Sequence, residues 1–232
     1  MLDFDAFKNI TYGLYLVSSR TEEQAAGCTV NTFGQVASNP PQVSVSINKE
    51  NHTAKVIQET KMYTAVSLTE SASMDLIGKF GFFCSCDVDK FEPFAVETDA
   101  LGLPYVAEQA NARFTVKVTD SVDLGTHILF IGTVVESEVL SREEPMTYAY
   151  YHTVKGGKTP PKAVSYVADE TPSTSVASAT AAQAFQQGEE PQGRVAWRCT
   201  ICGHIEEVDE LPEDFTCPLC GVGKELFERL VL

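Results

Sequence analysis

Four cysteines near the end of the sequence constrain the fold more than any other feature. They form two Cys-x-x-Cys-Gly motifs separated by fourteen residues, and they are Cys199, Cys202, Cys217 and Cys220. The two-residue spacing lets both sulfurs of a motif point at one centre, and the following glycine permits the tight turn. Two such motifs facing each other predict a tetrahedral four-sulfur site, which suits zinc or a single iron.

The sequence as a whole divides into three parts, of which the last contains these four cysteines. Residues 1–167 are long enough to bury a core, whereas residues 195–232 are too few to fold without a metal or disulfides. Between them, residues 168–194 are dominated by Pro, Ser, Thr, Ala, Gln and Gly, a composition typical of a flexible linker. The sequence therefore predicts a domain, a linker and a small metal-bound module.

Charge and cysteine usage exclude several classes of function. The formal net charge is -15, and no basic stripe is available to neutralise phosphates, so a nucleic-acid partner is not expected. No apolar run approaches the ~20 residues of a membrane span, and the N-terminus lacks the pattern of a secretory signal. Seven cysteines, an odd number, are typical of a reducing compartment. We expect a cytoplasmic protein that does not enter a membrane.

The first 167 residues are predicted to be mostly β, as a barrel with short helices. Alternation over 43–47 and the apolar residues of 63–68 and 126–135 predict strands, the last of them central in its sheet. Residues 114–118 read as an edge or half-exposed strand. Helices are predicted over 53–61 and 74–80, and an irregular functional loop over 80–91. Further strands are expected at 11–19 and 27–33, which are close enough to form a hairpin.

Small hydroxyl, amide and glycine residues gather at three places, 27–32, 44–53 and 80–90. Such residues at strand ends let backbone N–H groups approach a ligand. Each cluster alone is more often ordinary turn chemistry. Together they suggest a phosphorylated cofactor.

Several motifs over residues 2–167 occur in one order along the chain. They are Tyr12-Gly-Leu-Tyr, Thr29-Val-Asn-Thr, the segment 41–53, Ile77-Gly-Lys-Phe-Gly-Phe, Asp87-Val-Asp-Lys-Phe and the segment 125–134. This region resembles the flavin reductase-like family, which implies an FMN-binding split barrel, usually a homodimer. By the same resemblance, residues of three motifs would hold FMN: Thr29, Asn31, Thr32, Ser46, Asn48, Lys49, Thr53, Phe80 and Gly81.

The resemblance also places His127 near the flavin and the nicotinamide, as the candidate catalytic residue. A histidine that is simply hydrogen-bonded at a strand start is the alternative. Tyr148, Tyr151 and the loop 155–160 would border the nicotinamide site. Hydride passes directly to a flavin, so the protein mainly orients the two rings.

The sequence departs from the family at two places. Cys84-Ser-Cys86 stands where relatives often show Ser-Gly-Arg, and Gly125-Thr126 precedes the histidine instead of Gly-Asp. An arginine that contacts phosphate is therefore missing, and Lys49 is the natural charge partner for a phosphate. The two cysteines form a redox pair or act as two separate small hydrophobic residues, and the second interpretation is favoured.

Cysteine spacing alone does not choose between zinc and iron. Trp197, Phe215 and Phe227, with nearby prolines, predict a small aromatic core, and this part resembles rubredoxin, with a loop closer to the rubredoxin module of rubrerythrins. The acidity of the module suits an electron carrier that docks by complementary charge. These features favour one iron held by the four cysteines.

The whole sequence resembles a flavin reductase joined to rubredoxin. That resemblance implies transfer from NADH or NADPH through FMN to iron, and then to a flavodiiron protein that reduces oxygen or nitric oxide. Two alternatives remain open. One is a free-flavin or ferric reductase, and the other is a non-catalytic interaction protein with a zinc ribbon.

Overall fold

The structure is a computed structural model, and it describes residues 2–160, 163–165, 195–199, 205–206, 208–217 and 222–231. The predicted linker, 168–194, lies outside the described residues, as do Cys202 and Cys220. None of the helices that the structure describes is long and apolar enough to cross a membrane.

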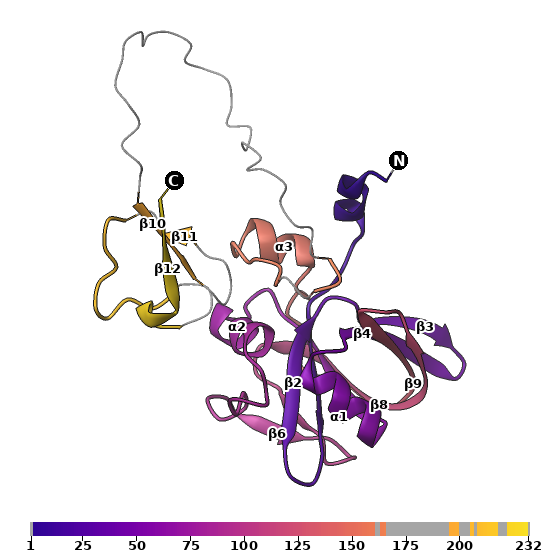
Figure 1. Ribbon diagram of the computed structural model, residues 1–232. Helices are drawn as coiled ribbons and strands as arrows, with labels where there is room; N and C mark the ends of the chain where they lie inside the picture. Colours follow the sequence, from indigo (N-terminus) through magenta and orange to yellow (C-terminus); the bar gives the residue numbers. More distant parts are fainter. Residues whose placement is uncertain are drawn as a thin grey trace.

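Seven antiparallel strands form the main sheet, in the order β2-β1-β5-β8-β9-β4-β3 (Figure 1). Their bounds are β1 Tyr15–Arg20, β2 Ala25–Val30, β3 Gly34–Ser38, β4 Pro41–Asn48, β5 Met62–Leu68, β8 Ala110–Asp123 and β9 His127–Val139. The predicted hairpin is confirmed as β1 and β2, which pair from Tyr15 opposite Val30 to Arg20 opposite Ala25. A mostly β fold with short helices is thus confirmed.

The sheet curls around an apolar core to which strands from both of its ends contribute. Cys28 of β2, Val45 of β4 and Phe130 of β9 are buried in the same cluster, together with Ile57 of α1. β4 alternates buried and half-buried side chains along its length, as the period-2 pattern predicts. A second cluster lies between β1, β5 and the helices α2 and α3.

Four short helices interrupt the strands. They are η1 Phe4–Asn9, α1 His52–Thr60, α2 Met74–Phe82 and α3 Tyr148–Thr153. Asn51 caps α1 by accepting the Thr53 N–H, and Ser73 caps α2 by accepting the Leu76 N–H. α1 buries Val56 and Ile57 as predicted.

The structure corrects two expectations about these elements. Residues 114–118 were expected to be an edge strand or a half-exposed strand, and only the second is confirmed, because β8 lies between β5 and β9 and carries both the buried Val116 and the exposed Lys117. The segment from Phe80 is not irregular throughout, because α2 continues to Phe82. Burial of Phe80 against Phe91 holds this last turn despite the helix-weakening Gly78 and Gly81.

Two small sheets complete the described chain. β6 Val96–Thr98 pairs with β7 Pro104–Val106. The C-terminal module has the order β11-β10-β12, with β10 Val195–Cys199, β11 Ile205–Glu206 and β12 Phe227–Val231, and a 3-10 turn η2 Lys224–Leu226. In Figure 1 this module lies beside α2.

A buried arginine joins β8 to β9. Arg113 is 3 % exposed and donates to Glu136 at 2.8 Å, to Glu138 at 2.9 Å and to the Thr115 hydroxyl at 2.8 Å. Its hydrogen bond, with a second from the Ala100 N–H, lowers the pKa of Glu136 to about 2. A carboxyl group whose pKa is lower in the folded state stabilises the fold above its unfolded pKa, and that contribution is lost as the pH falls.

We therefore expect Glu136→Gln to be less stable than the wild type at pH 7, and the difference to shrink as the pH falls from about 4.5 toward 2. Urea unfolding followed by circular dichroism at several pH values measures this. Glu92→Gln, at an exposed position of the same domain, serves as the control. A difference in stability between Glu136→Gln and the wild type that stays constant down to pH 2 would contradict the lowered pKa of Glu136.

Candidate functional site

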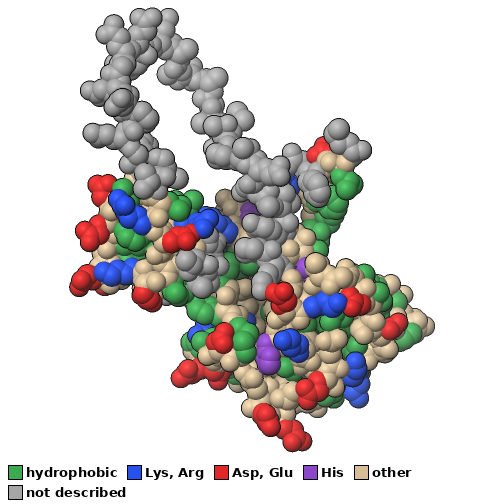
Figure 2. Space-filling view, viewed as in Figure 1, with side chains coloured by type: hydrophobic (Ala, Val, Ile, Leu, Met, Phe, Trp, Pro, Cys, Tyr) green, Lys and Arg blue, Asp and Glu red, His purple; other side chains and the backbone are tan. Residues whose placement is uncertain are grey.

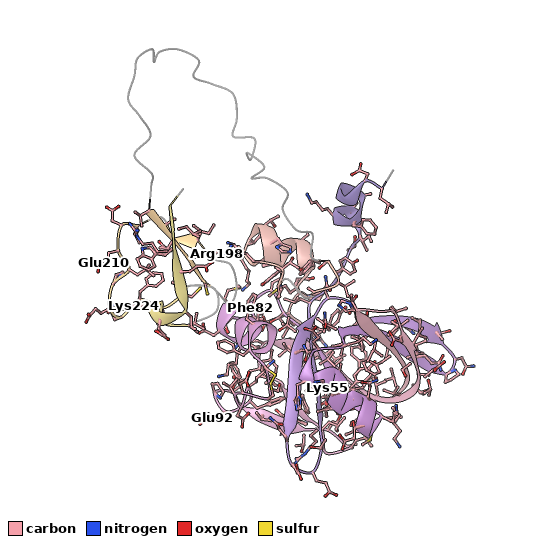
Figure 3. The ribbon with its side chains drawn as sticks, viewed as in Figure 1. Lys55, Phe82, Glu92, Arg198, Glu210 and Lys224 are labelled. Atoms are coloured by element: carbon pink, nitrogen blue, oxygen red, sulfur yellow. A yellow bond between two sulfur atoms is a disulfide. The ribbon has the colours of Figure 1, made fainter. Side chains whose placement is uncertain are left out.

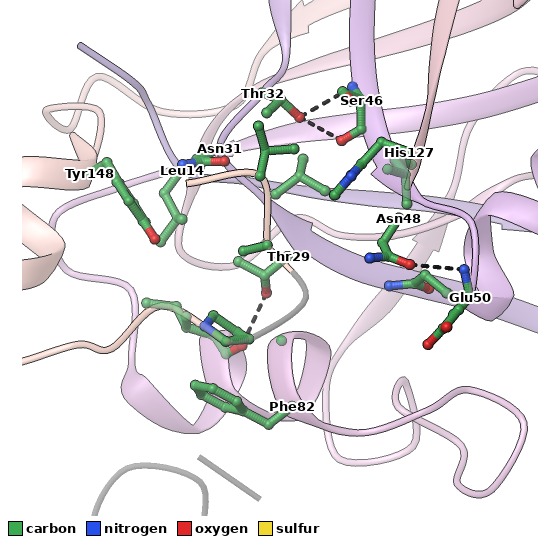
Figure 4. Close-up of a pocket in the computed structure, with 18 of the residues that line it drawn as sticks. Leu14, Thr29, Asn31, Thr32, Ser46, Asn48, Glu50, Phe82, His127 and Tyr148 are labelled. Atoms are coloured by element: carbon green, nitrogen blue, oxygen red, sulfur yellow. Dashed lines mark hydrogen bonds between the residues drawn. The ribbon is translucent and has the colours of Figure 1, made fainter. Parts of the chain in front are cut away.

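A cavity of about 400 Å³ opens where β2, β4, β9 and α2 meet (Figure 4). This volume lies in the range of roughly 300–1,000 Å³ that is usual for small-molecule sites. Seven of the ten residues predicted for FMN and for catalysis line it: Thr29, Asn31, Thr32, Ser46, Asn48, Gly81 and His127. The structure brings these residues together, and their roles toward a cofactor stay predictions.

Threonine hydroxyls fix the polar wall of the cavity. The Thr32 hydroxyl donates to the Ser46 carbonyl at 2.7 Å and accepts the Ser46 N–H at 3.2 Å, which holds the chain after β2 against β4. The Thr29 hydroxyl donates to the Ile77 carbonyl of α2 at 3.0 Å. Because each donor hydrogen is used within the protein, these hydroxyls offer acceptor lone pairs to a ligand.

Residues 158–160 and 163–165 border the cavity on the side of α3. The Asn31 side-chain amide donates to the Ser165 hydroxyl at 2.9 Å, and Ser165 donates to the Tyr148 hydroxyl at 3.2 Å. Tyr148 and Tyr151 stack with ring centroids 5.8 Å apart, and both line the cavity together with Lys158. The predicted position of these tyrosines beside the site is confirmed, while their role toward a nicotinamide stays a prediction.

His127 begins β9 opposite Asn48 of β4, and both side chains reach the cavity (Figure 4). Its Nδ1 lies 2.8 Å from the Thr126 hydroxyl. The residue thus combines both interpretations, because it is hydrogen-bonded at a strand start and also lines the cavity.

Three predicted residues lie outside the lining. Lys49 Nζ pairs with Asp123 at 2.6 Å, across the turn that joins β8 to β9. Thr53 is fully buried on the inner face of α1, and Phe80 is 1 % exposed in the core below α2. Each residue follows the cavity lining closely in sequence, but helix or turn geometry directs its side chain elsewhere.

The start of α1 is a part of the lining that suits an anion. Asn51 and His52 line the cavity at this helix N-terminus, next to Glu50, while Lys158 adds a cation on the side of α3. Helix N-termini favour anions because their N–H groups and dipole point outward. The sequence signal was Asn51, a good capping residue before a predicted helix.

A buried lysine, which sequence reasoning missed, ties α2 to β2 beneath the cavity. Lys90 Nζ donates to the Gly27 carbonyl at 2.8 Å and to the Phe80 carbonyl at 3.1 Å. Burial lowers the pKa of Lys90 to about 8. The signal was present in the Asp87-Val-Asp-Lys-Phe motif, but a lone lysine normally indicates surface.

Close packing of β2 on α2 predicts the effect of a single methyl group. A Cβ added at Gly27 would lie 2.7 Å from the Phe80 ring, whereas one at Gly34 would meet nothing within 4 Å. We expect Gly27→Ala to lower the free energy of unfolding by about 1 kcal/mol through overpacking. Gly34→Ala is the matched control, expected within about 0.5 kcal/mol of the wild type. Urea unfolding measures both, and equal effects would contradict this packing.

Cys84 and Cys86 form a disulfide directly after α2. The favoured interpretation, two separate small hydrophobic residues, is therefore wrong. Cys84 is half-buried and lines the cavity, and Cys86 is exposed. Folding of the loop around the buried Ser85 brings the two sulfurs together.

The metal module places two of its predicted ligands in one buried cluster. Cys199, at the end of β10, and Cys217 are 1 % and 2 % exposed. The Cys217 N–H donates to the Val222 carbonyl at 2.7 Å, which holds these two residues together. Phe215 and Phe227 meet edge to face at 5.3 Å, so the aromatic core is confirmed. Two buried thiols in one cluster fit a four-sulfur metal site.

The two sites meet at the end of α2. Phe82 and Phe83 line the cavity, and both also pack against the cluster that contains Cys199 and Cys217 (Figures 3 and 4). The same two side chains therefore border the cofactor cavity and the metal module.

Comparisons with known proteins match this arrangement. The flavin reductase like domain model matches residues 7–157, and the rubrerythrin, rubredoxin-like domain model matches residues 197–228. The chain is 36% identical to a high molecular weight rubredoxin of Moorella thermoacetica, over 99% of this chain and 100% of that protein. It is 40% identical to a ferric-chelate reductase (NAD(P)H) of Archaeoglobus fulgidus, over 71% of this chain and 98% of that protein.

A solved structure shares the fold of the first domain. It is the styrene monooxygenase flavin reductase of Pseudomonas putida S12, with a TM-score of 0.55 and 26% identity, over 63% of this chain and 92% of that one. The two domains together make the protein an electron-transfer oxidoreductase that uses flavin and iron. The chain belongs to the flavin reductase like family and carries a rubredoxin-like domain at its C-terminal end.

Proposed function

We propose that this protein passes electrons from NADH or NADPH through FMN to the iron of its rubredoxin-like domain. From there they would leave for an acceptor protein such as a flavodiiron oxygen or nitric oxide reductase. The observation that carries the proposal is the double role of Phe82 and Phe83, which border both the cavity and the buried cysteine cluster.

FMN would occupy the cavity, and it would supply the chemistry of hydride acceptance and of single-electron release. Thr29, Asn31 and Thr32 supply fixed polar groups on one wall, and the start of α1 suits the phosphate. Tyr148 and Tyr151 cover the opposite side and limit the access of water. His127 is positioned to orient the nicotinamide against the flavin.

Iron would be held by Cys199, Cys202, Cys217 and Cys220, and it changes by one electron. The buried surroundings of Cys199 and Cys217 exclude water from the centre. Contact of this cluster with Phe82 and Phe83 shortens the distance between the two cofactors within one chain. Tethering also keeps the acceptor iron at a high local concentration.

An acceptor protein would dock on the acidic outer side of the module. Asp209, Glu210, Glu213 and Asp214 are exposed there, and Figure 2 shows acidic side chains along the edge that faces away from the barrel. A partner with a basic patch fits this surface. We further propose a cytoplasmic homodimer as the working form.

An anaerobic titration of the purified protein, loaded with FMN and iron, tests the proposal. NADH is expected to bleach the flavin and then the iron absorbance in one experiment. Colourless protein that holds zinc and no iron would overturn the proposal. So would reduction of the flavin without the iron.

A second candidate function rests on the similarity to a ferric-chelate reductase. In this case the first domain alone would reduce ferric chelates. Equal rates of ferric-chelate reduction by the full chain and by a variant without iron would support that activity beside the main one.

A further inference from the structure

The cysteine pair of the 80–90 loop lies at the border between the cavity and solvent. Cys84 is half-buried and lines the cavity beside Phe82 and Phe83, while Cys86 is exposed. One sulfur of the disulfide thus faces the proposed flavin site, and the other is open to a second reactant. The electron path through FMN and iron uses neither.

The residue between the two cysteines is anchored to the barrel. Ser85 is 3 % exposed, and its hydroxyl accepts the Gly27 N–H at 3.1 Å. The Gln24 side-chain amide donates to the Ser85 carbonyl. Because both bonds tie Ser85 to β2 and the chain before it, the flanking cysteines keep their positions when the bond between them opens.

Local geometry also keeps the two sulfurs ready to close again. The Cα atoms of Cys84 and Cys86 are 5.1 Å apart, and the Cys86 N–H points at the Cys84 sulfur at 3.2 Å. A donor at this distance stabilises a negative charge on Cys84. Thiolate character is what thiol–disulfide exchange requires.

A purely structural role explains the pair poorly. A disulfide stabilises a fold more when it closes a longer loop, and this one encloses a single residue. Ser85 already holds the segment through its own hydrogen bonds. The bond is therefore not needed to fix the loop.

We propose that Cys84 and Cys86 form a redox-active disulfide that takes two electrons from the flavin site. This inference rests on the proposed function, because reduced FMN is the reductant. In the step, dihydroflavin loses two electrons and two protons, the S–S bond breaks, and each sulfur gains one proton. The exposed Cys86 thiol then attacks a disulfide substrate and releases one substrate thiol, and the Cys84 thiolate resolves the mixed disulfide, which releases the second thiol and restores the Cys84–Cys86 bond.

Differential alkylation of the full chain tests this inference. The protein, loaded with FMN and iron and oxidised with a mild disulfide-forming reagent, is treated anaerobically with excess NADH, quenched in acid and alkylated. Cleavage after Lys79 and Lys90 releases both cysteines in one peptide, 80–90. We expect this peptide to gain two alkyl groups after NADH and none before it, while the peptide carrying Cys28 gains one in both samples.

The results of this experiment distinguish a failure of the redox-pair inference from a failure of the proposed function. If flavin and iron bleach but peptide 80–90 stays unlabelled, the redox pair is wrong and the proposed function stands. If NADH leaves the flavin oxidised, the proposed function itself fails. Labelling by NADH without FMN would also overturn the inference, because the reductant must be the flavin.

Electron counting gives an independent measure. Cys84→Ser with Cys86→Ser is expected to take up one fewer equivalent of NADH per chain than the wild type, in samples matched for their content of flavin and iron. Cys28→Ala is the matched control, since Cys28 is 2 % exposed in the core and forms no disulfide. Equal NADH uptake by the wild type and the double variant would contradict the proposal.

Discussion

Replacing Cys199 with serine is expected to abolish electron output through iron. Cys199 is 1 % exposed, and its cluster with Cys217 and Leu211 is the core of the small module. Metal binding and folding are coupled in such modules, so the loss of one thiolate removes the metal and the fold together. We expect reduction of a one-electron haem-protein acceptor to fall more than about 100-fold, beyond the ~10–100-fold that the loss of an outer-shell partner costs.

Metal analysis and steady-state rates measure this effect. Bleaching of the flavin by NADH reports the first domain separately, because Cys199 lies on β10 outside the cavity lining. Cys28→Ser, at another buried cysteine, is the control and should retain its iron. An undiminished rate in Cys199→Ser would mean that electrons leave directly from the flavin.

Truncating Phe82 and Phe83 together is expected to slow transfer from flavin to iron by roughly 30-fold. Both rings are partly buried against the Cys199 and Cys217 cluster. Burial of a whole phenylalanine side chain contributes ~1.5–3 kcal/mol, so two half-buried rings contribute about 2 kcal/mol to docking. Without that contribution the docked arrangement is populated less, and each transfer waits longer for it.

Anaerobic rapid mixing with NADH resolves the two steps. The rate of iron bleaching is compared with the rate of flavin bleaching in the same sample, which corrects for any change in the cavity. Phe7→Ala, at a phenylalanine on η1 that is 51% exposed, is the matched control. An iron rate that rises in proportion to protein concentration would contradict transfer within one chain.

Local patterns along the sequence predicted much of this fold. Alternation in 43–47 identified β4, and the apolar residues of 53–61 identified α1, because both signals depend on neighbouring residues. The two Cys-x-x-Cys-Gly motifs and their aromatic neighbours identified the metal module for the same reason. Seven residues of the cavity followed from the resemblance to the flavin reductase-like family, not from local periodicity.

Contacts between distant segments could not be read from those patterns. Lys49 was assigned to a phosphate, but Asp123, 74 positions later, binds it at a turn whose register only the sheet defines. No position was predicted for the Lys90 side chain, and its burial depends on carbonyls of Gly27 and Phe80. The contact of Phe82 and Phe83 with the metal module likewise could be recognised only from a structure that contains both domains.

The position of Trp197 has a practical consequence. It is the chain's one tryptophan, and it lies on β10 two residues before Cys199. Its ring packs against the cysteine cluster, while the barrel carries phenylalanine and tyrosine instead. Indole fluorescence therefore arises in the metal module alone, and its quenching can follow metal loading, oxidation state and melting of that module without an added label.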